Sequence, residues 1–218
     1  MIKNLLFDLG GVIVPLNRIA CLRAFSDVIG YKDFGNILTS YKRVGIFEKY
    51  ENGSINSRKF RAGIRKDITS DPKGFTKQVT DSQIDYCLNC LLLPIPQDRI
   101  EALLFYKSDY RMFLLSNTNP IGMRYCRKLF RDKGYHIADI FEELFLSYKL
   151  KCAKPQREIF EKVIKKSKMV PEETLFIDDM VVNLETAASL GFKTLLYDPK
   201  KDLYKTIENR LIELENNE

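Results

Sequence analysis

The sequence contains a single histidine, no tryptophan and no long hydrophobic run. With His136 alone, it cannot build the histidine clusters that bind zinc or copper. No stretch approaches the ~18 consecutive apolar residues of a membrane span. The apolar N-terminal stretch is interrupted at Asp8 and lacks the basic start and cleavage site of a signal peptide. We therefore expect a cytoplasmic protein without a membrane segment.

Cysteine is also sparse, and the five residues are an odd number scattered along the chain. This pattern favours reduced thiols over a disulfide framework. Cys87 and Cys90 form a C-x-x-C pair, but they lie in a helix-like stretch with no second pair and no nearby histidine. Packing is the favoured interpretation, and a metal or redox role remains an alternative.

The charge balance indicates anionic partners of modest size. The 35 basic and 29 acidic residues give a net charge of +6, which attracts anions but does not identify a particular one. The basic residues are spread out, and the densest cluster, at 165–168, falls where a predicted helix ends and cations suit its dipole. We expect a small phosphorylated metabolite as partner and no nucleic acid. The sequence does not indicate an oligomeric state.

The hydrophobic pattern predicts a core domain with a helical insertion. Residues 4–14 are a short apolar strand that opens into a loop at Asp8, Gly10 and Gly11. Helical periodicity then extends to about residue 93 and ends at the prolines of 94–96. We assign residues 17–96 to a helical cap domain and residues 1–16 and 97–218 to the core.

The core shows regular alternation of strands and helices. Strands are expected at 111–116, 144–147, 174–178 and 193–197, with helices between them and a further helix near 201–215. This order predicts a doubly wound α/β fold with a parallel sheet, which binds ligands beyond the carboxyl ends of its strands. The side chains expected in its core include Phe7, Leu115, Phe176 and Ile177.

Polar side chains stand where the predicted strands end. Asp8, Ser116 and the pair Asp178 and Asp179 follow three strands, and Lys154 opens a helix after a fourth. Each residue alone could be a helix cap, a turn residue or a solvated lysine. Together they form one chemical set, because carboxylates bind Mg²⁺, the lysine and hydroxyl suit a phosphoryl group, and an aspartate can attack phosphorus.

These residues resemble the motifs of the haloacid dehalogenase-like hydrolase superfamily. The matching segments are Phe-Asp-Leu-Gly-Gly-Val at 7–12, Leu-Ser-Asn at 115–117, Lys-Pro at 154–155, and Phe-Ile-Asp-Asp at 176–179 followed by Asn183. The helical insertion is similar to the cap domain of this class. Its segment 47–55 resembles the branch that contains glucose-1-phosphate phosphatases and the N-terminal phosphatase domain of soluble epoxide hydrolase.

The resemblance implies a Mg²⁺-dependent phosphatase. Asp8 is then the nucleophile that becomes phosphorylated and a metal ligand, with the carbonyl of Gly10 and the carboxylate of Asp179 as further ligands. Ser116 and the backbone amide of Asn117 hold phosphate oxygens.

Three more residues receive supporting roles from the resemblance. Lys154 neutralises charge between the nucleophile and the phosphoryl group. Asp178 orients Lys154 or a metal-bound water, and Asn183 does similar supporting work or is an exposed helix residue.

The sequence departs from the superfamily at Gly10, where most phosphatases of this type carry an aspartate as general acid and base. Such help is worth about 10²–10⁴-fold. A sugar 1-phosphate has a more acidic leaving group and needs less protonation, so we hypothesise such a substrate. The alternatives are a non-catalytic member that binds a phosphate ligand or a partner protein, and a 2-haloacid dehalogenase, against which the intact metal-binding set counts.

A second departure lies in residues 149–153, where relatives usually carry a glycine and often an acidic residue. Lys149 and Lys151 stand there instead. The favoured interpretation is two solvated lysines, with a role in anion entry as the alternative. The missing glycine implies a backbone conformation that lysine adopts reluctantly.

Overall fold

The computed structural model describes residues 1–31, 45–69 and 78–216. Residues 32–44 and 70–77 of the predicted helical cap domain lie outside these ranges, as does the C-terminal pair 217–218. The helical face expected at Ile37, Tyr41 and Val44 therefore falls on residues that are not described.

A parallel sheet of five strands forms the centre of the core. Its strands are β1 (Asn4–Phe7), β2 (Arg111–Ser116), β3 (Glu143–Leu146), β4 (Thr174–Asp178) and β5 (Lys193–Leu196), in the order β3-β2-β1-β4-β5. All neighbours pair in parallel, and Phe7 lies opposite both Leu114 and Ile177. The predicted doubly wound α/β fold is confirmed.

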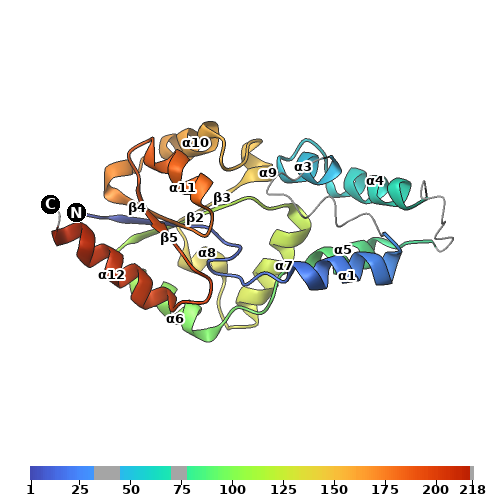
Figure 1. Ribbon diagram of the computed structural model, residues 1–218, viewed down its shortest axis with the longest axis horizontal. Coiled ribbons are helices and arrows are strands. Elements are labelled where there is room, and N and C mark those ends of the chain that lie inside the picture. Colours follow the sequence, from blue (N-terminus) through green and yellow to red (C-terminus); the bar gives the residue numbers. More distant parts are fainter. Residues whose placement is uncertain (32–44, 70–77, 217–218) are drawn as a thin grey trace.

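Alternate residues of the strands serve the two faces of the sheet. Leu5, Phe7 and Ile177 pack on one face against α6 (Gln97–Tyr106), α7 (Pro120–Arg131), α8 (Ile137–Ile140) and α12 (Leu203–Asn216). Leu6 and Phe176 pack on the other face against α10 (Arg157–Ser167) and α11 (Val181–Ala188). Figure 1 shows these two helical layers on opposite sides of the strands. Because both faces are covered, the central residues of β1, β2 and β4 are apolar.

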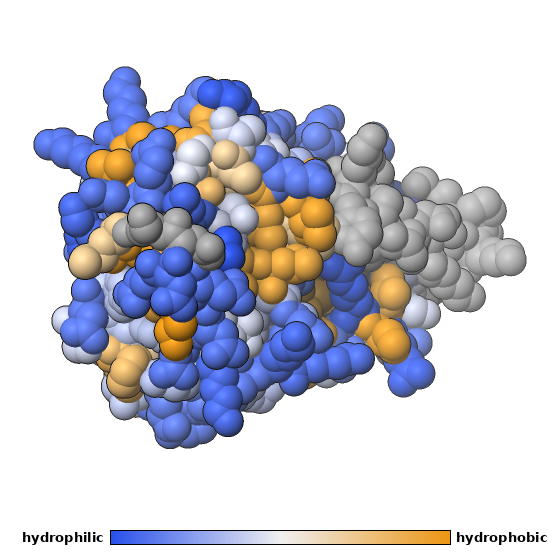
Figure 2. All heavy atoms as spheres, turned by 60° about the vertical axis from the view of Figure 1, so that its left-hand side comes forward, coloured by the Kyte–Doolittle hydropathy of each residue, from blue (hydrophilic) through white to orange (hydrophobic). Residues whose placement is uncertain are grey.

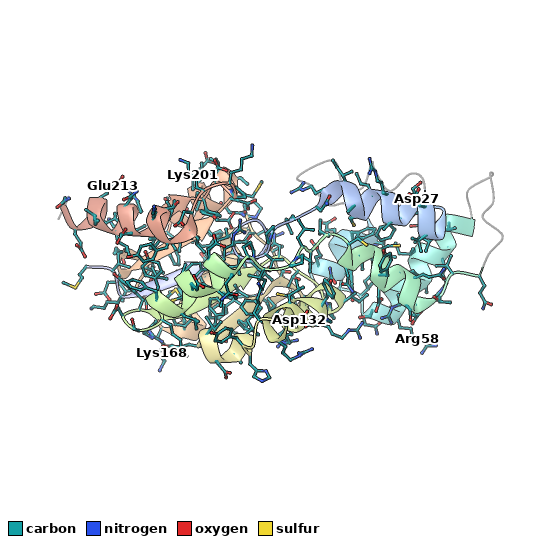
Figure 3. All side chains as sticks on the ribbon, turned by 90° about the horizontal axis from the view of Figure 1, so that it is seen from below. Asp27, Arg58, Asp132, Lys168, Lys201 and Glu213 are labelled. Carbon is teal, nitrogen blue, oxygen red and sulfur yellow. The ribbon has the colours of Figure 1, made fainter. Side chains whose placement is uncertain are left out.

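The helical insert leaves the core after β1 and returns before α6. It contains α1 (Arg18–Ile29), α3 (Ile46–Glu51), α4 (Ser57–Thr69) and α5 (Asp81–Asn89). The Asn17 side chain caps α1 by accepting from the Ala20 amide, and Thr80 forms a capping box at α5. The insert has a hydrophobic cluster of its own, centred on Phe25, Phe47 and Phe60. Figures 1 and 3 place it beside the core at one end of the molecule.

The two connections between insert and core run side by side. The Asn17 amide donates to the Leu91 carbonyl at 2.8 Å, and the Leu93 amide donates to the Pro15 carbonyl at 2.9 Å. Leu16 and Leu92 face each other in this short antiparallel bridge. The connections thus meet close to the predicted boundaries at residues 16 and 96.

The insert also contacts α7 of the core. Asp85 on α5 pairs with Arg61 on α4 at 2.7 Å and with Arg124 on α7 at 2.6 Å. Ile121, near the start of α7, is buried in the hydrophobic cluster of the insert. Insert and core are therefore held together by apolar contact and by an ion pair.

The cysteines behave as structural thiols. None of the five forms a disulfide, and the Cys87 thiol is buried where it donates to the Ala24 carbonyl at 3.2 Å. Burial raises the pKa of Cys87 to about 12, which keeps this thiol protonated. Packing thus accounts for the buried member of the C-x-x-C pair.

Three short elements differ from the sequence prediction. The one-turn helices α8 and α9 (Ser147–Leu150) and the 3₁₀ turn η1 (Pro171–Glu173) were not expected, and α9 begins where the third strand was expected to end. A single turn contains too few residues to show a helical period.

The face in Figure 2 is largely hydrophilic, with an apolar area near its centre. None of the helices in the described ranges is both long and apolar enough to cross a bilayer.

Leu115 tests how far stability depends on the sheet core, because it is fully buried, as are Phe7, Phe176 and Ile177. Leu115→Ala should lower the free energy of unfolding by about 2–5 kcal/mol, measured by chemical denaturation. Leu196→Ala is the matched control, because this side chain is 53% exposed and its loss should cost less than about 0.5 kcal/mol. Equal losses in the two variants would contradict the core assignment.

Candidate active site

The polar residues predicted from the strand ends meet at the carboxyl edge of the sheet. Asp8 directly follows β1, whereas Ser116 and Asp178 are the last residues of β2 and β4. Lys154 reaches this edge from the segment between α9 and α10. Ser116, Lys154 and Asp178 are all buried, and Asp8 is only 8% exposed.

The Lys154 ammonium group lies at the centre of the site. Its Nζ donates to Asp8 Oδ1 at 2.7 Å, to Asp178 Oδ2 at 2.6 Å and to the Leu115 carbonyl at 3.1 Å. Burial lowers the pKa of Lys154, but Asp178 and Asp8 outweigh this effect and hold the pKa above its usual value. Lys154 is therefore a fixed positive charge beside Asp8.

Asp178 is saturated by protein contacts. Its Oδ1 accepts from the Met180 amide at 2.8 Å and from the Asn183 side chain at 2.9 Å. Its Oδ2 accepts from Lys154 and, at 3.1 Å, from Asn183. In this structure Asp178 and the buried Asn183 thus orient Lys154, which is one of the two roles considered for Asp178.

The three carboxylates form a site of the right composition for a divalent cation. Asp8, Asp178 and Asp179 each present an oxygen within 4.8 Å of the others. When ionised, they carry three negative charges against the one positive charge of Lys154. Because Asp178 is already saturated, Asp8 and Asp179 are the carboxylates that fit Mg²⁺, which typically takes one or two carboxylates in proteins.

The uncompensated charge also affects the carboxyl groups themselves. Burial raises the pKa of Asp8 to about 7, although Lys154 opposes the shift. Burial and the neighbouring Asp178 raise the pKa of Asp179 as well. Both groups therefore favour a nearby cation.

The glycine loop after Asp8 passes directly beside Asp179. Gly11 has a φ of +90°, and a Cβ atom at this position would lie 2.3 Å from Asp179 Oδ2. The loop closes through a bond from the Gly11 amide to the Val14 carbonyl at 2.9 Å. Only glycine meets both requirements at Gly11, a role that the sequence prediction did not assign.

Gly10 lies where related phosphatases carry their general acid and base. A Cβ atom on Gly10 would lie 3.3 Å from Leu16 Cδ1 and 3.4 Å from Leu16 Cδ2. The side chain of Leu16 therefore occupies the direction in which a longer residue at this position would extend.

Asn117 contacts the backbone of Lys154 in both directions. Its Oδ1 accepts from the Lys154 amide at 2.9 Å, and its Nδ2 donates to the Lys154 carbonyl at 2.8 Å. The sequence prediction concerned only the backbone amide of Asn117, and no pattern in the sequence pairs its side chain with a residue 37 positions away. Asn117 joins the end of β2 to the lysine of the site.

The segment 149–153 differs from the favoured sequence interpretation at Lys151. This residue has a φ of 62°, so the backbone shape implied by the missing glycine is present. Its Nζ is not simply solvated, because it donates to the Gly53 carbonyl of the insert. Lys149 is exposed, as expected.

A family model for haloacid dehalogenase-like hydrolases matches residues 2–191. The chain belongs to this family. The D-ribitol-5-phosphate phosphatase of Bacteroides thetaiotaomicron is 34% identical over 204 residues, which cover 89% of this chain and 91% of that protein. The fold and the ordered motifs of the chain thus agree with its sequence relatives.

Solved structures of the haloacid dehalogenase-like (HAD) family superpose over nearly the whole chain. A HAD family enzyme from Bacteroides thetaiotaomicron, in complex with magnesium and inorganic phosphate, has a TM-score of 0.83 at 38% identity and covers 93% of this chain and 97% of its own. A predicted HAD-like family hydrolase from Porphyromonas gingivalis has a TM-score of 0.87 at 34% identity, with coverage of 97% and 98%. The helical insert is therefore included in the similarity.

The raised pKa of Asp8 predicts a stability cost in the metal-free protein. The pKa of Asp8 is 3.8 in the unfolded chain and about 7 in the folded protein. The free energy of unfolding therefore falls as the pH rises between these two values. Asp8→Asn in EDTA should therefore raise Tm clearly more at pH 8 than at pH 5, with about 2–4 °C for each kcal/mol relieved. Differential scanning fluorimetry measures both values.

Asp132→Asn is the control for this prediction, because Asp132 is an exposed carboxylate paired with Lys128. Its Tm should change by the same small amount at both pH values. An Asp8→Asn protein that is no more stable than the wild type at pH 8 would contradict the assigned charge imbalance.

Proposed function

We propose that this protein is a Mg²⁺-dependent phosphatase that hydrolyses a small phosphorylated sugar or polyol through an aspartyl-phosphate on Asp8. The observation that carries the proposal is the buried Lys154 between Asp8 and Asp178, with Asp179 and Ser116 at the same edge of the sheet. This arrangement offers a nucleophile, a fixed cation and a hydroxyl to one phosphoryl group.

The reaction proceeds in two displacements. The Asp8 carboxylate attacks phosphorus, an oxygen–phosphorus bond forms, and the bond to the leaving oxygen breaks. The leaving oxygen takes a proton from solvent water. A second water molecule then attacks phosphorus and gives up a proton to solvent, the phosphorus–oxygen bond to Asp8 breaks, and inorganic phosphate and the free carboxylate result. Lys154 stabilises the charge on the phosphoryl oxygens in both steps, and the Ser116 hydroxyl and Asn117 amide hold those oxygens.

Asp8, Asp179 and the Gly10 carbonyl would hold Mg²⁺. When bound, the ion supplies positive charge that neutralises the phosphoryl oxygens. The acidic cluster and the raised pKa values of Asp8 and Asp179 support this assignment.

Two substrate types follow from different observations. Gly10 provides no proton for the leaving group, which favours a sugar 1-phosphate because its leaving hydroxyl is more acidic. The name of the Bacteroides relative favours an open-chain polyol 5-phosphate, the ester of a primary alcohol. The helical insert, residues 17–96, is the proposed cap that selects between them.

Phosphate release from a substrate panel tests the activity. Sugar 1-phosphates, sugar 6-phosphates, D-ribitol 5-phosphate and nucleotides should be compared with Mg²⁺ and with EDTA. Turnover should require Mg²⁺ and fall by at least about 10³-fold in Asp8→Asn, which cannot form the intermediate. A folded, Mg²⁺-loaded protein that is silent across the panel would favour the non-catalytic binding alternative.

The ranking within the panel tests the leaving-group argument separately. If proton donation limits the rate, sugar 1-phosphates should exceed sugar 6-phosphates in kcat/KM by about 10-fold or more. Equal values, or preference for D-ribitol 5-phosphate, would reject the 1-phosphate hypothesis and leave the phosphatase assignment intact.

The metal site is testable without turnover. Mg²⁺ at 100 times its Kd should stabilise the wild type by about 2.7 kcal/mol, seen as a rise in Tm. Asp179→Asn should reduce this rise, whereas Asp132→Asn should retain it because Asp132 directly follows α7 and lies outside the acidic cluster. An unchanged Mg²⁺ response in Asp179→Asn would place the ion elsewhere.

A further inference from the structure

Ser147 lies between the helical insert and the loop that follows β2. It is fully buried at the first position of α9. Its hydroxyl accepts from the Thr118 amide at 3.0 Å and donates to the Glu51 carbonyl of α3 at 2.7 Å. One side-chain oxygen therefore contacts both the insert and the core.

The chemistry of a hydroxyl makes this contact selective. A serine hydroxyl has one hydrogen, and two carbonyl oxygens lie within its reach. The Glu51 carbonyl is the nearer at 2.7 Å, and the Thr118 carbonyl is at 3.1 Å. While segment 50–53 of the insert contacts the core, the Ser147 hydroxyl donates its hydrogen to the Glu51 carbonyl, and its oxygen lone pair accepts from the Thr118 amide.

Thr118 belongs to the loop that carries the proposed phosphate contacts, since Ser116 and Asn117 directly precede it. The first turn of α7, directly after this loop, is also held by the insert, because the Tyr50 hydroxyl accepts from the Ile121 amide at 3.3 Å. Tyr50 thus contacts the helix that follows the loop, and its neighbour Glu51 is linked to the loop through Ser147.

We propose that Ser147 is a positioning residue that couples the seating of insert segment 50–53 to the geometry of the phosphate-binding loop 116–119. This inference rests on the proposed function for the role of the loop. With segment 50–53 seated, Ser147 fixes the Thr118 amide and the two residues before it. Without that contact, the loop loses part of its preorganisation for a phosphoryl group.

Lys151 provides a matched control on the same edge of the insert. Its Nζ donates to the Gly53 carbonyl, and among the described residues it forms no hydrogen bond or ion pair with loop 116–119. Gly53 itself lies close to the core, since a Cβ atom there would be 2.1 Å from the Tyr148 carbonyl oxygen. Loss of the Lys151 side chain therefore removes one contact of Gly53 and leaves the bonds of Ser147 to Glu51 and Thr118 in place.

The first experiment compares Ser147→Ala with Lys151→Ala. Inorganic phosphate is titrated by calorimetry in the presence of Mg²⁺, and amide hydrogen exchange at Thr118 is followed with neither ligand present. Ser147→Ala should weaken phosphate binding up to about 10-fold, the value of one hydrogen bond, and should speed exchange at Thr118. Lys151→Ala should bind phosphate within about twofold of the wild type.

The effects on kcat and KM distinguish a positioning role from a general loss of stability. Ser147→Ala should lower kcat with a smaller change in KM, and Tyr50→Phe, which keeps the ring stacked on Phe60, should shift kcat in the same direction. Unchanged phosphate binding and Thr118 exchange in Ser147→Ala would overturn the coupling. Equal effects of Ser147→Ala and Lys151→Ala would overturn it too.

The wild type keeps the proposal testable if Ser147→Ala does not fold. Phosphate binding should then slow amide exchange in segments 50–53 and 116–119 together, and protection of 116–119 alone would overturn the coupling. The two proposals fail in different ways. A wild type that releases no phosphate from any ester would reject the proposed function. The comparison of amide exchange at Thr118 between wild type and Ser147→Ala would still test the role of Ser147.

Discussion

The buried ammonium group of Lys154 is the interaction on which the site depends. An uncompensated charge in this position would be strongly unfavourable, and the carboxylates of Asp178 and Asp8, at 2.6 and 2.7 Å, compensate the charge of Lys154. Three strands end at these contacts, since Leu115 of β2 also accepts from Lys154. The same ion pairs therefore hold the edge of the sheet together and place a cation beside the proposed nucleophile.

The charge of the site explains why this edge suits a metal and a phosphoryl group at once. Lys154 offsets only part of the negative charge of Asp8, Asp178 and Asp179, and burial then raises the pKa of Asp8 to about 7. Asp178 is fully hydrogen-bonded by Lys154 and Asn183. Asp8 and Asp179 are therefore the carboxylates left to bind a cation. A site with this imbalance gains more from a divalent cation than from further hydrogen bonds.

The sequence was sufficient for the sheet and for the residues at its edge, because both follow from local patterns. The strands at 111–116 and 174–178 are found where the apolar runs predicted them, and a parallel sheet must bring their ends together. The contacts of Ser147 and of the Asn117 side chain were not predictable in this way. They join segments 96 and 37 residues apart through single polar atoms, which leave no period in the sequence. Lys151 is intermediate: its backbone shape followed from the missing glycine, whereas its bond to Gly53 did not.

Gly10 connects the chemistry of the site to the seating of the helical insert. The space beside its α-carbon is taken by Leu16, whose backbone also forms the bridge to Leu92 between the two connections of the insert. A carboxylate at position 10 would require the Leu16 side chain to shift. The position expected to carry a general acid therefore packs against a residue that lies in the attachment of the insert. Without a general acid, the proposed reaction depends on the fixed charge of the site and on the geometry of the phosphate loop. The core supplies the charge through Lys154. The interface with the insert holds the loop through Ser147 and segment 50–53.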